Sequence, residues 1–242
     1  MKWDRSKGRP EPIRALNRIL ERENGEPMVD MRLAAPSLTA MRPVVIPWCR
    51  ESVARMAESA GRSLPRGVRL GYVEAWRPWI RQKRIFDWMW SCLEEARPGL
   101  PHAVMRRKVC RWVAPVDQKA PPGHCTGAAL DVYLLDEDGK ELDVTSPFDR
   151  FRSTPTYTFG LSETAQRNRT LLVETMLEAG FSNCRDEFWH YSYGDAGWAV
   201  RTGRDECFYG LVELPESEWW ESQIQWEETL KDRVNPFLSR DP

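Results

Sequence analysis

The chain contains 242 residues, of which 41 % are hydrophobic, with 35 Lys and Arg against 36 Asp and Glu and a formal net charge of −1. This length supports one well-buried core and does not require a second domain. Because the charge is balanced, no overall field favours nucleic acid or an anionic membrane, and we expect neither as a partner. No apolar stretch approaches the length of a membrane span.

The N-terminal residues 1–24 are charged throughout and lack the apolar block of a secretory signal. We therefore expect a soluble, cytoplasmic protein. The six cysteines are widely spread and form no Cys-x-x-Cys pair, which argues against a zinc knuckle and against a disulfide-dense secreted scaffold. We expect them to be reduced and mostly buried.

The first half of the chain alternates helical and extended patterns. Apolar residues at helical spacing predict an amphipathic helix over residues 13–23, which Asn24-Gly25 ends. Prolines punctuate residues 27–47, so that stretch should be extended or irregular. A helix is then expected over 51–60, a strand over 67–76 that ends at Arg77-Pro78, and a helix over 82–96.

In the second half, an apolar strand over 128–135 follows Pro121-Pro122-Gly123. A helix is expected over 162–179, with Ser162 at its start and Gly180 at its end. A short aromatic strand over 186–193 and a strand or loop over 206–214 come next. Because strands and helices do not alternate as βαβ units, we predict an α+β fold in one domain, with a small antiparallel sheet flanked by helices.

The same patterns suggest how the chain is organised. We expect an N-terminal helical extension over residues 1–25, a catalytic domain over 26–214, and a peripheral helix with a tail over 215–242.

Two of the three histidines lie beside carboxylates in otherwise buried-looking segments. Asp131 interrupts an apolar strand, where an ionised carboxylate is costly unless it pairs with a cation or binds a metal. His124 precedes it by seven residues, and Gly127 between them allows the backbone to bend so that the two side chains meet. Glu187 and His190 are three residues apart and reach one side together if a turn ends before Trp189.

Two imidazoles and one carboxylate make a three-ligand site suited to one Zn²⁺ per chain. The fourth position stays open for water, as in a catalytic rather than a structural zinc site. Zinc lowers the pKa of that water and polarises a bound carbonyl, and Glu187 could carry the proton from the water to a leaving amine. These parts predict hydrolysis of an amide. His102, which has no carboxylate nearby, and Cys125, which would over-fill the site, are not expected to be ligands.

Several motifs carry a family resemblance in consistent order over residues 29–193. PPGHCTGAALDVYL (121–134) resembles the S-x-H-x-x-G-x-A-x-D motif of the D-alanyl-D-alanine dipeptidases of the VanX type, and DEFWHYSY (186–193) resembles their E-x-W-H motif. EAWRPW (74–79) is similar to the Y-R-P that ends a strand in that family, SPFDRF (146–151) is similar to its F-D segment, and residues 160–181 are similar to the helix before E-x-W-H.

The resemblance implies a hedgehog/D,D-peptidase-like fold and a zinc-dependent hydrolase of a D-Ala-D-Ala-type dipeptide. It implies zinc ligation by His124, Asp131 and His190, with Glu187 as general base. By the same resemblance Arg77 would stabilise the oxyanion of the tetrahedral intermediate, for which a permanent, forked charge is apt. Asp149 would bind the free α-amino group of the substrate and so exclude longer chains.

Two departures from the family concern substrate binding: Pro122 stands in place of a Ser, and Leu33 in place of a Tyr that lines the pocket. Two alternatives therefore stay open. One is a murein (peptidoglycan) D,D- or L,D-carboxypeptidase acting on stem peptides, and the other is a non-catalytic zinc-binding module of the same fold. The sequence also leaves open the physiological dipeptide and whether the chain forms a homo-oligomer.

Overall fold

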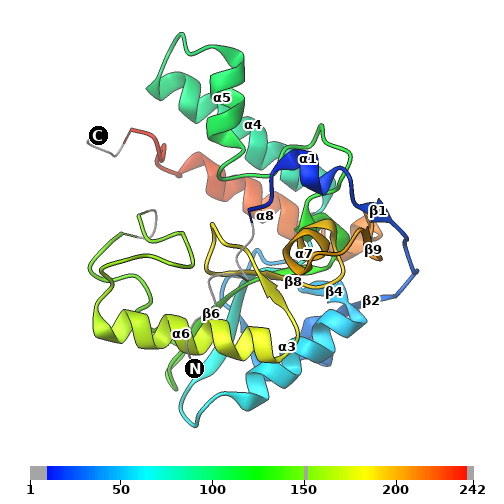
Figure 1. Cartoon of the computed structure of the whole chain (residues 1–242), viewed down its shortest axis with the longest axis vertical. Coiled ribbons are helices and arrows are strands. Elements are labelled where there is room, and N and C mark those ends of the chain that lie inside the picture. The colour runs from blue at the N-terminus through cyan, green and yellow to red at the C-terminus, as the bar shows by residue number, and fades with distance from the viewer. Residues whose placement is uncertain (1–9, 150–151, 239–242) are drawn as a thin grey trace.

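The chain folds into short strands and helices that do not follow a regular βαβ order (Figure 1). The computed structural model describes residues 10–149 and 152–238. The strands are β1 (Leu20–Glu21), β2 (Met28–Asp30), β3 (Leu38–Ala40), β4 (Trp48–Arg50), β5 (Arg69–Glu74), β6 (Ala129–Leu135), β7 (Ser182–Asn183), β8 (His190–Ser192) and β9 (Glu206–Cys207). The α-helices are α1 (Ile13–Leu16), α2 (Met31–Ala34), α3 (Glu51–Ser63), α4 (Trp79–Ala96), α5 (His102–Val109), α6 (Glu163–Glu178), α7 (Ala196–Thr202) and α8 (Trp220–Lys231), and the 3-10 helices are η2 (Gly123–Thr126) and η3 (Glu216–Glu218).

The central sheet has five strands in the order β3-β5-β6-β8-β7. Its pairs are antiparallel except for β3 with β5, which is parallel. The predicted α+β class is therefore confirmed, and the expected antiparallel sheet carries one parallel edge strand. β6 lies in the middle and reads as an almost continuous apolar run, as expected for a strand covered on both faces.

Helices α3 and α6 lie side by side across one face of this sheet (Figure 1). Their alanines, leucines and valines join the buried faces of β5 and β6 in the main hydrophobic core. The side chain of Ser162 accepts a hydrogen bond from the Ala165 N–H at the start of α6, so the predicted helix start is confirmed. Gly180, which follows α6, has the positive φ of +101° that a helix end commonly requires.

Helices α4 and α5 form a hairpin at the other end of the molecule, next to α8 (Figure 1). They share a second apolar cluster with the residues that follow α5. A hydrogen bond of 2.8 Å from Arg81 to Gln223 joins α4 to α8, and Trp226 of α8 is buried. The predicted C-terminal helix is confirmed and packs closely on the body.

The N-terminal segment differs from its prediction. The helix expected over residues 13–23 ends at Leu16, and Leu20–Glu21 instead pairs in parallel with Glu206–Cys207. The competing interaction is tertiary, because Leu16 and Ile19 pack with Trp198 of α7 and a longer helix would carry the next residues away from β9. The N-terminal segment therefore lies along α7 and β9.

Among the described residues no helix is both long and apolar enough to cross a membrane.

All six cysteines are free, and four of them are buried. This confirms the expectation that the cysteines are reduced and mostly buried.

Candidate active site

Three side chains with metal-binding atoms converge at one end of the central sheet. Asp131 of β6 and His190 of β8 are direct partners in the antiparallel register, so their side chains leave the same face. His124 comes from η2, which turns into β6 at Gly127 with a φ of +71°. One ligand atom from each of the three residues lies within 4.8 Å of the others. The bend predicted at Gly127 is therefore present.

Hydrogen bonds orient both imidazole rings. The Nδ1–H of His124 donates to the carbonyl oxygen of Ala75 over 2.9 Å, which directs Nε2 towards Asp131. His124 Nε2 lies 3.2 Å, and His190 Nδ1 3.0 Å, from the same Asp131 oxygen. A backbone carbonyl that fixes the second ring nitrogen is the usual support for a metal-ligating histidine.

The charges at this point favour a cation. Burial alone would raise the pKa of Asp131, but the two facing imidazoles hold it well below its ordinary value. Asp131 is thus an ionised carboxylate in a buried position, which requires a positive partner. Two imidazole nitrogens and one carboxylate oxygen at this spacing fit the donor set of Zn²⁺ with an open fourth position.

Glu187 lies in the irregular stretch that precedes β8, where the sequence predicted a strand from residue 186, and it lines the same cleft as His124, Asp131 and His190. Burial raises its pKa to about 8, and the charges of Asp131 and Glu11 act in the same direction, while Arg77 opposes them. A carboxyl group with a pKa near the working pH can both accept and return a proton.

Arg77 follows the end of β5 and is anchored to the metal-binding segment, because its N–H donates to the carbonyl of His124 over 3.1 Å. Its guanidinium group donates to Glu74 over 3.0 Å and to Gln82 over 2.7 Å. Burial lowers the pKa of Arg77, but the charges of Glu74 and Asp131 outweigh it and raise the pKa. The group therefore stays cationic beside the site. The sequence did not indicate that Gln82 would accept a hydrogen bond from the guanidinium group of Arg77.

A cleft of about 620 Å³ contains the three ligands, Glu187 and Arg77. Its walls include two regions that the sequence did not point to. One is the N-terminal segment, through Glu11, Ile13 and Leu16, and the other is the stretch after α5, through residues 110–115. Neither region carries a motif, so only the tertiary structure reveals them as part of the cleft.

Asp149 is not among the residues that line this cleft. Its side chain is 57 % exposed and accepts a hydrogen bond from the Arg152 N–H over 2.8 Å. The expected contact with a substrate amino group gains no support from this position. His102 is exposed at the start of α5, and buried Cys125 points no ligand atom into the metal-binding cluster, as predicted.

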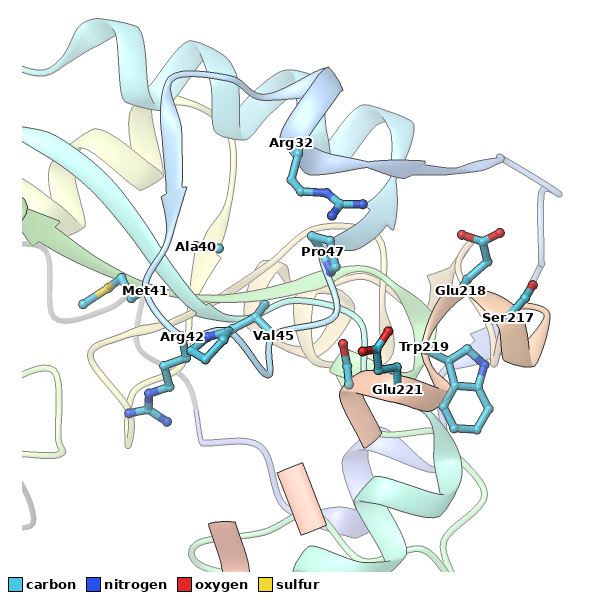
Figure 2. A pocket seen from close by; sticks show the side chains of 12 residues that line it. Arg32, Ala40, Met41, Arg42, Val45, Pro47, Ser217, Glu218, Trp219 and Glu221 are labelled. Atoms are coloured by element: carbon cyan, nitrogen blue, oxygen red, sulfur yellow. The ribbon is translucent and has the colours of Figure 1, made fainter. Parts of the chain in front are cut away.

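A second hollow of about 470 Å³ lies between the segment that follows β3 and the start of α8. In Figure 2, Arg32 projects from the side opposite Glu218 and Glu221. The Arg32 guanidinium is already held by Asp30 over 2.6 Å. The residues that line this hollow include neither histidine nor cysteine.

Known proteins resemble this chain in sequence. The D-alanyl-D-alanine dipeptidase of Synechocystis sp. (strain ATCC 27184 / PCC 6803 / Kazusa) is 36 % identical over 121 residues, which is 42 % of this chain and 49 % of that protein. The chain thus spans about half the length of that relative. The D-alanyl-D-alanine dipeptidase of Escherichia coli (strain K12) is 27 % identical over 161 residues, which is 66 % of this chain and 73 % of that protein.

Two solved structures show a more distant likeness, each at 18 % sequence identity. One is a mutant of the vancomycin-resistance D,D-pentapeptidase VanY from a VanB-type cassette in complex with Zn(II), with a TM-score of 0.38 over 64 % of this chain and 77 % of that one. The other is VanYB in complex with D-alanine-D-alanine, with a TM-score of 0.40 over 65 % and 79 %.

The sequence pattern of the D-ala-D-ala dipeptidase family matches residues 75–207. That stretch begins at Ala75, whose carbonyl orients His124, and includes Asp131, Glu187 and His190. The chain belongs to the D-ala-D-ala dipeptidase family of peptidases.

Proposed function

We propose that this chain is a zinc-dependent D,D-dipeptidase that hydrolyses a D-Ala-D-Ala-type dipeptide. The observation that carries the proposal is the convergence of His124, Asp131 and His190 within 4.8 Å in a cleft that Glu187 and Arg77 also line. A cytoplasmic location stays a prediction.

The three ligands would hold one zinc ion, which when bound polarises the scissile carbonyl and makes a water molecule acidic enough to attack it. Glu187 accepts the proton of the attacking water and returns it to the nitrogen of the leaving D-amino acid, so the C–N bond breaks with no net change of charge. Arg77 offers its guanidinium to the carbonyl oxygen as negative charge develops there. Glu74 and Gln82 keep that guanidinium in one orientation.

A D,D-carboxypeptidase acting on peptidoglycan stem peptides is the second candidate. Two observations favour it: Asp149 does not line the cleft, and a cleft of about 620 Å³ has room for more than two small residues. Both candidates use the same chemistry and differ only in how much peptide lies on the amino side of the cleaved bond.

The substitution Glu187→Gln tests the reaction and the substrate together. The wild-type protein is purified, its zinc is counted by mass spectrometry, and release of D-alanine is measured from D-Ala-D-Ala and from a stem pentapeptide. We expect one zinc per chain and turnover of the dipeptide alone. The variant should keep its zinc and lose about 10²- to 10⁴-fold in kcat, because general acid-base catalysis is removed.

Glu163→Gln is the matched control, since the side chain of Glu163 is 94 % exposed on α6. Turnover of the pentapeptide would favour the carboxypeptidase. Zinc binding without turnover of either peptide would leave a non-catalytic zinc-binding module, and full activity of Glu187→Gln would contradict the role of this residue.

A further inference from the structure

The loop that carries Glu187 joins two strands of the central sheet. This Glu187 loop, residues 184–189, runs from β7 to β8 and ends directly before the metal-binding residue His190. Among the described residues no group donates a hydrogen bond to the carboxylate of Glu187, and its surroundings act on it through burial and charge. The place of this carboxylate in the cleft therefore depends on how the backbone of the loop is held.

Asn183, the last residue of β7, gathers carbonyl groups of this loop and of the strand that follows. Its side chain is buried, and its Nδ2 lies 3.1 Å from the carbonyl oxygen of His190 and 3.4 Å from those of Glu187 and Phe188. Carbonyl oxygens only accept hydrogen bonds, so the NH2 group of the amide is the side that faces them. One buried amide thus joins the backbone of the proposed general base to the backbone of a metal-binding residue.

A second segment of the chain orients this amide and holds the other side of the loop. The hydroxyl oxygen of Thr156 lies 2.6 Å from Asn183 Oδ1 and 2.7 Å from the carbonyl oxygen of Cys184. The Phe188 N–H donates to the carbonyl oxygen of Thr154 over 2.9 Å. Because the Thr156 hydroxyl donates to the amide oxygen, the NH2 group is directed towards the loop carbonyls.

Arg169 of α6 fastens the segment that carries Thr156. Its buried guanidinium donates to the Pro155 carbonyl oxygen over 2.9 Å and lies 4.0 Å from the centre of the Phe188 ring. An arginine over an aromatic face is a stabilising arrangement. The Glu187 loop is therefore enclosed between β8, which pairs with β6, and a segment that is attached to α6.

We propose that Asn183 is a positioning residue, which holds the backbone of the Glu187 loop so that the Glu187 carboxylate meets the attacking water. The inference rests on the proposed peptidase function. Asn183 does not line the cleft, so it acts through Glu187. His190 depends less on this amide, because it is also held by its pairing with Asp131. Loss of the amide therefore displaces the base and leaves the metal bound.

The test compares Asn183→Ala with wild type in the full-length zinc-loaded protein. The kcat per bound zinc and KM are measured with D-Ala-D-Ala, and amide hydrogen exchange of residues 184–190 is followed by mass spectrometry. We expect kcat to fall about 10- to 100-fold, since a misplacement of about 1 Å can cost that much, with KM and zinc content unchanged. Hydrogen exchange in the loop should become faster.

Asn235→Ala is the matched control. The side chain of Asn235 also donates to a backbone carbonyl, that of Cys92 over 2.8 Å, and Asn235 does not line the cleft. This variant should keep the wild-type kcat and the wild-type hydrogen exchange of residues 184–190.

A double-variant cycle separates positioning from a general loss of stability. With Glu187→Gln in place no base is left to position, so adding Asn183→Ala should lower kcat no further. A residue that only stabilises the fold would lower the kcat of Glu187→Gln by the same factor as that of wild type, and this result would overturn the proposal. Unchanged hydrogen exchange in Asn183→Ala, or a rise in KM with kcat intact, would overturn it as well.

Thr156 supplies a second test that does not depend on the folding of Asn183→Ala. Thr156→Val keeps the shape of the side chain but removes the hydroxyl that orients the amide, whereas Thr156→Ser keeps the hydroxyl. We expect kcat to fall about tenfold in Thr156→Val and to stay near wild type in Thr156→Ser, and equal losses in both would contradict the proposal. A wild-type protein that releases no D-alanine would refute the proposed function, and hydrogen exchange would then still decide whether Asn183 orders the loop.

Discussion

The metal-binding centre and the N-terminal wall of the cleft are built in different ways. At the centre, Asp131 and His190 are fixed by the pairing of two neighbouring strands, and His124 by a hydrogen bond to a backbone carbonyl. In the described part of the chain, which begins at residue 10, the N-terminal wall contains the two-residue strand β1 and packs on α7 through side-chain contacts. Strand register therefore fixes the positions of Asp131 and His190, whereas part of the cleft lining comes from segments that are far away in sequence.

Arg50 joins the two regions. Its buried guanidinium donates to the carbonyl oxygen of Thr126 in the metal-binding turn over 2.8 Å, and to Glu23 of the N-terminal segment over 3.0 Å. It also donates to the Gly210 carbonyl oxygen over 3.3 Å. The wall is thus fastened to the same turn that presents His124, although it contributes no metal ligand.

The substitution Asp131→Asn removes one proposed zinc ligand and should have the largest effect. An amide cannot supply the negative charge that the two imidazoles face, so we expect zinc to be lost and kcat/KM to fall by more than about 10³-fold. Metal content by mass spectrometry and D-alanine release measure the two losses. Glu163→Gln, purified in parallel, should keep both. Zinc bound at wild-type affinity in Asp131→Asn would remove this residue from the ligand set.

The convergence of His124, Asp131 and His190 was predictable from the sequence, because the signals that bring these residues together are local. A carboxylate inside the apolar run of β6 needs a cation, and a glycine at position 127 supplies the bend that brings His124 back to it. Glu187 and His190 are close in sequence, so the turn between them determines how their side chains lie relative to each other. The major helices and strands follow the same logic, since their hydrophobic periods agree with the burial that they reach in the fold.

The cleft wall was not predictable, because no local pattern specifies which distant segment will cover the site. Residues 17–23 have helical spacing, yet pairing with β9 outweighs that preference. Glu11 carries no motif, and only the tertiary structure reveals its ion pair with Arg201 and its place in the cleft lining. Asp149 is the opposite case, because its motif resembles that of the family but its side chain is 57 % exposed.

The substitution Arg77→Lys tests a residue beside the metal-binding centre. Lysine keeps the charge near Glu74 but loses the fork that donates to Glu74 and Gln82 at once. We expect kcat to fall about 10²-fold with little change in KM, as for loss of one donor to the transition-state oxyanion. Steady-state kinetics with D-Ala-D-Ala, together with zinc content, provide the measurement. A rise in KM with kcat intact would instead show that Arg77 binds the ground state.

Glu26→Gln tests how the wall is fastened and should have the smallest effect. Burial alone would raise the pKa of Glu26, but hydrogen bonds from Ser52 and Tyr209 hold it below its ordinary value. A lowered pKa in the folded state means that ionised Glu26 stabilises the fold above its unfolded pKa of about 4.3, and that this stability is lost as the pH falls through the folded pKa.

We therefore expect Glu26→Gln to lower the free energy of unfolding by about 1 kcal/mol at pH 7, because bonds to a charged acceptor are weakened at a partly exposed site. The difference from wild type should shrink as the pH drops below 4, in urea unfolding followed at each pH. Zinc content should stay at one per chain, since no ligand is touched. A difference that is constant across this pH range would mean that Glu26 stabilises the wall by packing, and the charge of the carboxylate would then have no part in holding the N-terminal segment over the cleft.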